Sequence, residues 1–180
     1  MFVFRGWGDL DMRLRQMAVA FLFNEAQDVL FLQKKKGSRF LAGHLVPVGG
    51  HIEDGEYSDP RIACLREVTE ETGLTGQDIG GLTLRYIINR LKAGQEIRIQ
   101  YIFMGNVAPG SRLVPGEEGE LLWLEAGRAG GMQATASTRA VLQHYLETGI
   151  HNNHIYTGTM HSQQGDPAVS WSVLEDWEEY

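Results

Sequence analysis

Apolar residues gather along the chain in short blocks, and their spacing predicts a succession of strands. Two blocks, at 17–23 and 29–33, are separated by a turn-forming stretch and predict two consecutive strands. A shorter block at 44–48, just before Gly49-Gly50, predicts a third. Lys34–Lys36 follow the second block, and we expect them to lead the chain into solvent.

The clearest helical signal covers residues 60–72. Asp59 is a favourable N-cap, Pro60 suits the first helical position, and Gly73 suits the C-terminal stop. The expected core-facing stripe of this helix consists of Ile62, Leu65, Val68, Thr69 and Thr72. A second helix is predicted at 137–146 and is closed by a glycine, Gly149.

The remaining periodic segments are β-like. They are a hairpin formed by 82–90 and 96–106, a short strand at 121–124, and two pieces in the tail, 154–160 and 168–174. Because the strands outnumber the helices, we expect an α+β fold with a mixed or antiparallel sheet. We expect one domain over residues 1–180, with a β-like extension from about 151 that covers the site, adds an edge strand or forms a homodimer interface.

Composition narrows the class of protein. The chain has 180 residues, of which 43% are hydrophobic, enough for one well-packed core. Its apolar runs are too short to span a bilayer, and residues 1–11 lack the features of a secretory signal. Cys64 is the only cysteine, which excludes an intramolecular disulfide and fits a reducing compartment. We therefore expect a soluble, cytoplasmic protein that does not enter the membrane.

Charge is concentrated in one segment. The formal net charge of −7 argues against a non-specific nucleic-acid binder, so we expect no nucleic-acid partner. Seven carboxylates and two arginines lie between Glu53 and Glu71, so this segment carries most of the excess negative charge. Such a concentration predicts a bound counter-ion.

On the predicted helix, Glu67, Glu70 and Glu71 fall within roughly 100° of one another around the axis. Three carboxylates on one face repel one another, whereas Mg²⁺ would use them as hard oxygen ligands and bridge them to substrate phosphates. The alternative is a solvated helix face with an Arg66–Glu70 ion pair. The preceding Gly49-Gly50 favours the metal site, because glycine lets a backbone carbonyl approach an ion closely.

Residues 50–74, GHIEDGEYSDPRIACLREVTEETGL, closely resemble the Nudix box, G-x5-E-x7-R-E-U-x-E-E-x-G-U, where U is aliphatic. The matching positions are Gly50, Glu56, Arg66, Glu67, Val68, Glu70, Glu71, Gly73 and Leu74. In one departure, nine residues separate Glu56 from Arg66 where the pattern has seven. We expect the surplus, around 57–59, to lengthen the loop and leave the helix intact.

The resemblance implies an α/β/α sandwich and a Mg²⁺-dependent hydrolase, with Mn²⁺ as a possible substitute. Its substrate would be a small nucleotide, either a nucleoside di- or triphosphate or a nucleoside diphosphate linked to another moiety. The implied metal ligands are the Gly50 carbonyl, Glu67, Glu70 and Glu71. Glu56 would either support the metal or orient Arg66, which would brace the loop against the helix. A metal-polarised water would attack phosphorus with help from a carboxylate base, either Glu67 or a later glutamate such as Glu118.

Other interpretations stay open at the level of sequence. The chain could be a non-catalytic Nudix-fold module that senses a nucleotide, or an isomerase like the isopentenyl-diphosphate isomerases. Candidate phosphate-binding side chains are Arg13, Arg15, Arg85, Arg90 and Arg98. Tyr86, Tyr101, Phe103 and Trp123 could stack on a base, although aromatic residues in strands more often build the core. The late histidines, His144, His151, His154 and His161, are expected in exposed turns.

Overall fold

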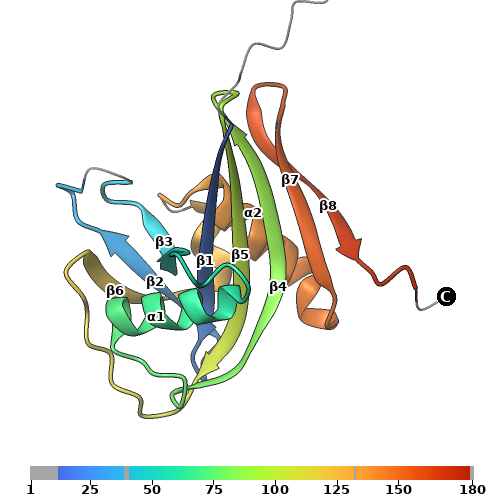
Figure 1. Cartoon of the computed structure of the whole chain (residues 1–180). Helices are drawn as coiled ribbons and strands as arrows, with labels where there is room; N and C mark the ends of the chain where they lie inside the picture. Colours follow the sequence, from blue (N-terminus) through green and yellow to red (C-terminus); the bar gives the residue numbers. More distant parts are fainter. Residues whose placement is uncertain (1–11, 39–40, 132, 179–180) are drawn as a thin grey trace, which may run out of the picture.

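A single mixed sheet runs through the computed structural model, which describes residues 12–38, 41–131 and 133–178 (Figure 1). Residues 1–11, where no secretory signal was expected, lie outside the described part of the chain. The described strands are β1 Arg13–Phe23, β2 Asp28–Lys34, β3 Leu45–His51, β4 Ile79–Lys92, β5 Glu96–Val107, β6 Gly119–Glu125, β7 Ile155–Gln163 and β8 Asp166–Leu174. The helices are α1 Pro60–Thr72 and α2 Ala136–Glu147, with short 3-10 turns at Ala126–Gly131 and Gly149–His151.

The strand order is β6-β2-β3-β1-β5-β4-β7-β8. β1 runs parallel to β5, and β4 parallel to β7, while the other neighbours are antiparallel. The two consecutive strands expected at the start of the chain do form, but β3 lies between them. β1 and β2 therefore pair directly only at Phe23 and Val29. The predicted fold class, α+β with a mixed sheet, is confirmed.

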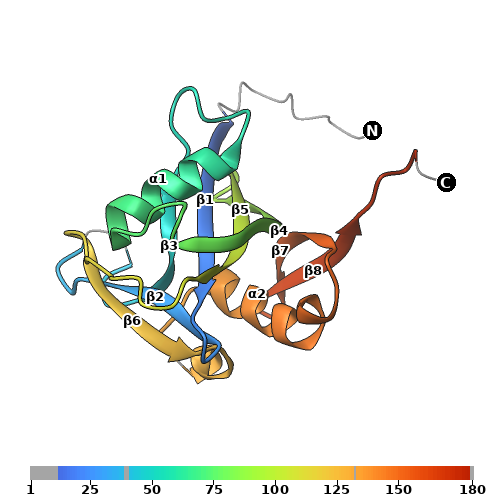
Figure 2. The same cartoon turned by 90° about the horizontal axis from the view of Figure 1, so that it is seen from below.

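The helices cover opposite faces of the sheet, with α1 over β1, β3 and β5 and α2 on the other side (Figure 2). β1 supplies both cores by alternation. Ala18, Ala20 and Leu22 pack in the core beneath α1, whereas Val19 and Phe21 pack in the core beneath α2. Since both faces are buried, this strand is a continuous apolar run rather than an alternating one.

Helix α1 begins and ends where the sequence predicts. Asp59 accepts a hydrogen bond from the Arg61 backbone N–H at 3.0 Å, and Gly73 adopts a left-handed conformation with φ 72°. The predicted core-facing stripe is partly wrong, because Ile62 and Thr69 are exposed. The helix is rotated by its packing against the sheet, and the residues it buries are Ala63, Cys64, Val68, Glu71 and Thr72. One of the acidic side chains therefore faces the protein interior.

The C-terminal hairpin β7–β8 extends the sheet beside β4 and packs against α2. Trp171 lies directly over Gly158, where a Cβ atom would come within 2.5 Å of its ring. His144 of α2 packs against this Trp171 ring and Tyr156, so its expected place in an exposed turn is wrong. The other three late histidines are exposed. The hairpin covers a helix face that would otherwise meet solvent, which explains why His144 is half-buried.

Arg85 binds the segment between α2 and β7. Its guanidinium donates hydrogen bonds to the backbone carbonyls of Gly149, Asn152 and His154 at 2.8–3.1 Å. This arginine therefore holds the start of the extension instead of facing a cleft. That the chain forms one domain stays a prediction. Among the described residues, no helix is long and apolar enough to cross a membrane.

Candidate functional site

Glu71 extends from α1 toward the end of β3. Its Oε2 accepts a hydrogen bond from the Gly49 backbone N–H at 2.7 Å. Gly49 has φ +132°, and a Cβ atom there would lie 2.4 Å from the Ala18 carbonyl oxygen, so the position requires glycine. Burial raises the pKa of Glu71 to about 7. An ionised carboxylate here would be stabilised by a nearby positive charge.

Gly50 allows a second close approach. A Cβ atom on Gly50 would lie 2.4 Å from Oε2 of Glu67, so the carboxylate rests directly against the backbone. The sequence predicted that the diglycine would bring a carbonyl near an ion. The structure places the carboxylate of Glu67 beside that same backbone segment.

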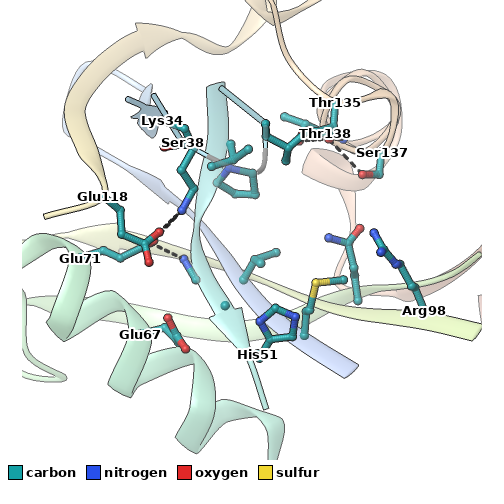
Figure 3. A pocket seen from close by; sticks show the side chains of 18 of the residues that line it. Lys34, Ser38, His51, Glu67, Glu71, Arg98, Glu118, Thr135, Ser137 and Thr138 are labelled. Carbon is teal, nitrogen blue, oxygen red and sulfur yellow. Dashed lines mark hydrogen bonds and ion pairs between the residues drawn. The ribbon is translucent and has the colours of Figure 1, made fainter. Parts of the chain in front are cut away.

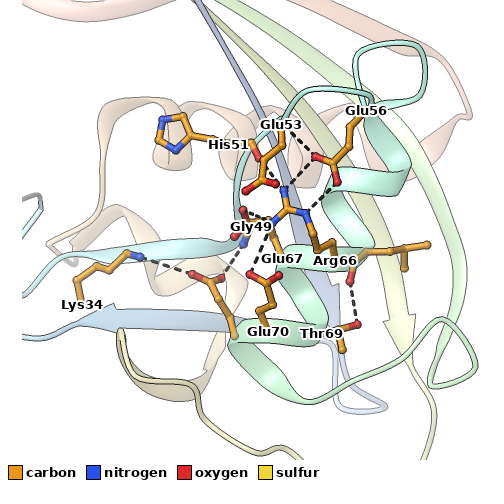
Figure 4. Close-up of polar contacts among 11 residues, drawn as sticks. Lys34, Gly49, His51, Glu53, Glu56, Arg66, Glu67, Thr69 and Glu70 are labelled. Carbon is orange, nitrogen blue, oxygen red and sulfur yellow. Dashed lines mark hydrogen bonds and ion pairs between the residues drawn. The ribbon is translucent and has the colours of Figure 1, made fainter.

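Arg66 ties the loop before α1 to the helix (Figure 4). Its Nε and Nη2 donate to the two carboxylate oxygens of Glu56 at 2.8 and 3.0 Å, and its Nη2 also donates to the His51 carbonyl. Its Nη1 donates to Glu67 at 2.8 Å. The hydrogen bonds from Arg66 lower the pKa of Glu56 to about 2. Of the two roles expected for Glu56, orienting Arg66 is therefore the one that the geometry favours, and the longer loop absorbs the two surplus residues.

Lys34 is a member of the site that sequence reasoning missed. Lys34 was expected to lead the chain into solvent, but it is the last residue of β2 and its side chain is only 16% exposed. The ammonium lies 3.5 Å from Glu71 and forms a short ion pair with Glu118. Lys34 of β2 pairs with Gly119, the first residue of β6. This register places Glu118, the residue just before β6, beside Lys34. The strand pairing that places Lys34 is not visible in the sequence.

These elements enclose a cavity of about 250 Å³, here called the carboxylate cavity. Its lining is Leu32 and Gly116 together with five glutamates, Glu67, Glu70, Glu71, Glu117 and Glu118. The structure thus brings the three helical carboxylates together with Glu118 from a distant loop. Glu56 lies outside this cavity.

The donor set of the carboxylate cavity fits a hard divalent cation such as Mg²⁺, which prefers oxygen ligands. Within the described ranges, no three acidic, imidazole or thiol side chains already surround a common point. Two side-chain cations hold the carboxylates instead. Lys34 pairs with Glu71. Arg66 pairs with Glu67 and lies 3.6 Å from Glu70. A bound cation would replace these side-chain cations as the partner of the glutamates.

A larger pocket of about 610 Å³, here called the main pocket, adjoins the carboxylate cavity (Figure 3). Glu67, Glu71, Glu117 and Glu118 line both. Apolar side chains in the main pocket are Met17, Val19, Leu41, Val46, Pro47, Ile88 and Met160. Its polar lining includes Lys34, Lys35 and Ser38, the hydroxyls of Thr135, Ser137 and Thr138 in and just before α2, and His51, Arg90, Arg98 and Gln100.

This lining separates the candidates named from the sequence. Arg90 and Arg98 border the main pocket, whereas Arg85 does not. None of the four aromatic candidates borders it, and Tyr86 and Phe103 are buried in the core. The hydroxyl-bearing residues of α2 were missed because helix packing, rather than any local motif, brings them to the pocket.

Comparison with known proteins agrees with this geometry. A family model described as the NUDIX domain matches residues 12–142. The MutT protein from Methanosarcina mazei Go1 superposes with a TM-score of 0.66 at 23% identity, covering 78% of this chain and 99% of that one. A mutator MutT protein from Bacillus halodurans gives a TM-score of 0.63 at 22% identity, covering 88% and 97%. An Ap4A hydrolase from C. elegans gives 0.63 at 17% identity, covering 77% and 99%. A search of the curated proteins found no match.

The chain belongs to the Nudix family, because the family model covers most of its length. The class of protein predicted from the sequence, a Nudix-type nucleotide pyrophosphohydrolase, is confirmed at the level of the family. The match ends before β7 and β8, so the C-terminal hairpin lies outside the matched region.

Proposed function

We propose that this protein is a Mg²⁺-dependent hydrolase, with Mn²⁺ as a substitute, that cleaves a phosphoanhydride bond in a nucleotide. The substrate is a nucleoside di- or triphosphate, or a nucleoside diphosphate linked to another moiety. One observation carries the proposal: the five-glutamate cavity opens into a larger pocket with many apolar side chains. The cavity suits a cation with its phosphates, and the pocket suits the nucleoside or the linked group.

The proposed metal ligands are the Gly50 carbonyl, Glu67, Glu70 and Glu71. When bound, the metal ion would offset negative charge on the phosphates and make a water more acidic. Glu71 is the ligand that a cation affects most, because burial disfavours its charge when no cation is present. Arg66 positions Glu67 and, through the His51 carbonyl, holds the end of β3 that carries the Gly50 carbonyl.

Glu118 is the proposed general base, which accepts a proton from the attacking water on a carboxylate oxygen. Its side chain is 60% exposed and stands where the two cavities meet, so a water can reach it. Glu67 is the alternative base, and its carboxylate is hydrogen-bonded to Arg66 as that of Glu118 is to Lys34. Because the Glu67 side chain is only 17% exposed, it is less accessible to water and is better suited to a fixed ligand.

The size and lining of the main pocket support a nucleotide substrate. About 610 Å³ lies in the usual range for small-molecule sites, and apolar walls with a few polar groups are typical of them. The Ap4A hydrolase among the structural neighbours acts on a nucleotide, which is consistent with this class.

The test is release of phosphate and pyrophosphate from a broad nucleotide panel, with Mg²⁺ and with EDTA. We expect selective release that needs the metal ion. Silence across the panel from folded protein would contradict the proposal and favour the nucleotide-sensing module. If a substrate is found, the rates of Glu118→Gln and Glu67→Gln with that substrate are compared, and the variant with the larger loss of kcat identifies the general base. Glu120→Gln is the control, because Glu120 lies in β6 close to Glu118 in sequence but lines neither cavity.

A further inference from the structure

Three arginines form a row across the sheet, in neighbouring positions of β1, β5 and β4. Arg98 of β5 lies directly opposite Arg15 of β1 on one side and Arg90 of β4 on the other. Residues directly opposite in neighbouring strands project from the same face, and like charges in such positions repel one another. We call Arg15, Arg98 and Arg90 the arginine row.

The carboxylate beside the row explains only part of this charge. Glu96 is 5% exposed and accepts a hydrogen bond from Nε of Arg98, which holds the pKa of Glu96 below its ordinary value. Arg15 and Arg13 lie 3.6 and 4.0 Å from the same carboxylate. A single arginine would neutralise Glu96. Arg90, in contrast, has no ion pair with Glu96 among the described contacts.

Two members of the row line the main pocket, and the third contacts another residue of its wall. Arg90 and Arg98 line it together with His51 and Gln100, and Arg15 donates from Nη1 toward Nε2 of His51 at 3.0 Å. Gly49, whose N–H binds the Glu71 carboxylate, pairs with Val19 of β1. Val19 is four residues along that strand from Arg15. Four residues of strand span about 13 Å, so the main pocket is acidic at one end and basic at a well-separated position.

We propose that the arginine row is a second anion subsite, which binds a phosphate group of the substrate other than the one under attack. The inference deepens the proposed function and rests on it for the identity of the substrate. Guanidinium groups match phosphate oxygens with paired hydrogen bonds, and their mutual repulsion falls when an anion lies between them. The second phosphate belongs either to a longer polyphosphate chain or to a phosphate ester on the sugar.

The first test measures anion binding without catalysis. Inorganic pyrophosphate is titrated calorimetrically into the full chain in EDTA, so that no metal ion occupies the carboxylate cavity. We expect the wild type to bind, and Arg90→Gln to weaken binding roughly tenfold through loss of a charge-assisted hydrogen bond. Arg112→Gln removes the same charge from a residue that lines neither cavity, and binding should be unchanged.

Arg90 is the best position to change because it is exposed and does not contact Glu96, so the fold keeps its buried ion pair. Arg98→Lys is the second variant, since it keeps the charge and loses the planar fork. It should also weaken pyrophosphate binding. Equal binding by wild type and both variants, or no binding by the wild type, would overturn the subsite.

The second test distinguishes the two sources of phosphate by steady-state kinetics with Mg²⁺. One arm compares a dinucleoside tetraphosphate with a nucleoside triphosphate, and the other compares nucleotides with and without a phosphate on the ribose. In one of these two pairs, Arg90→Gln should raise KM more for the substrate that carries the extra phosphate than for the substrate that lacks it. An equal change in KM within both pairs would contradict the proposal. Because the calorimetric test needs no turnover, a chain that hydrolyses nothing would refute the proposed function separately.

Discussion

Two regions of this molecule gather polar side chains, and they do so in different ways. Near the C-terminal hairpin, the Arg85 guanidinium donates hydrogen bonds to three backbone carbonyls. Nδ1 of His144 lies 3.1 Å from the Tyr86 hydroxyl oxygen. Burial lowers the pKa of His144 and so favours the neutral form of its ring. In the carboxylate cavity, by contrast, five glutamates line one small space. In the first region the polar side chains bind backbone carbonyls and a tyrosine hydroxyl, whereas in the second two side-chain cations, Lys34 and Arg66, hold several carboxylates.

The two regions differ in what their polar groups contribute to the fold. A satisfied cluster stabilises the fold, and breaking it leaves buried groups without partners. The carboxylates of the cavity outnumber the side-chain cations beside them, and we propose that a divalent cation supplies further positive charge there. The two regions should therefore respond to substitution in opposite ways.

The largest expected effect is on catalysis. Glu70→Gln and Glu71→Gln should each lower kcat/KM by about a hundredfold or more, because each removes a charged ligand of the proposed metal ion. Circular dichroism should show that both variants remain folded. Glu120→Gln is the matched control with the same chemical change outside both cavities. Near-wild-type rates in both variants would refute the assignment of the ligands.

Arg85→Met should show the reverse pattern. Three backbone carbonyls would lose their donors, so we expect the free energy of unfolding to fall by about 2–4 kcal/mol, measured with urea. The folded fraction should still turn over substrate at a rate near that of the wild type. Arg128→Met, which removes only an exposed ion pair with Glu125, is the control. Lost turnover with unchanged stability would place Arg85 in the functional region.

The pH dependence of stability should single out Glu71 in metal-free protein. Burial raises its folded pKa from 4.5 to about 7, so the folded state binds the proton more tightly than the unfolded state. This contribution is fully present below pH 4.5 and is lost as the pH rises through 7. In EDTA, the free energy of unfolding should fall by about 1 kcal/mol more between pH 6 and 8 in wild type than in Glu71→Gln. Parallel profiles would show that the Glu71 carboxyl does not titrate in this way.

A smaller effect is expected at Lys34, whose ammonium stands between Glu71 and Glu118. Lys34→Met should lower the melting temperature by a few degrees in EDTA, because it leaves the buried Glu71 carboxylate without its cation. Mg²⁺ should restore most of the loss, since it binds the native state. Lys35→Met removes the same charge from the neighbouring residue and should respond little. An equal shift in both variants would show a general effect of charge.

The sequence predicted the parts of this molecule that local chemistry determines. Helix α1 was located because Asp59, Pro60 and Gly73 all mark the same boundaries. Its rotation was not predicted, since contact with β3 decides that Ile62 is exposed and Glu71 is buried. The carboxylates of α1 share a motif and could be named.

Other site residues depend on long-range pairing. Lys34 was expected in solvent because a run of lysines usually ends a strand, and the register of β2 with β6 places it in the site instead. The arginine row has no local signature, because Arg15, Arg98 and Arg90 come from three strands that only the folded sheet aligns. His144 was assigned to an exposed turn because the hairpin that covers it is also a tertiary feature.

We propose that the carboxylate cavity binds a divalent cation. The direct test is to titrate Mn²⁺ into the metal-free protein and to measure free Mn²⁺ by electron paramagnetic resonance. The wild type should bind Mn²⁺ and release it to excess Mg²⁺, while the double variant Glu70→Gln, Glu71→Gln should bind at least about tenfold more weakly. Equal Mn²⁺ binding by the wild type and the double variant, with both proteins folded, would contradict this assignment of the metal site.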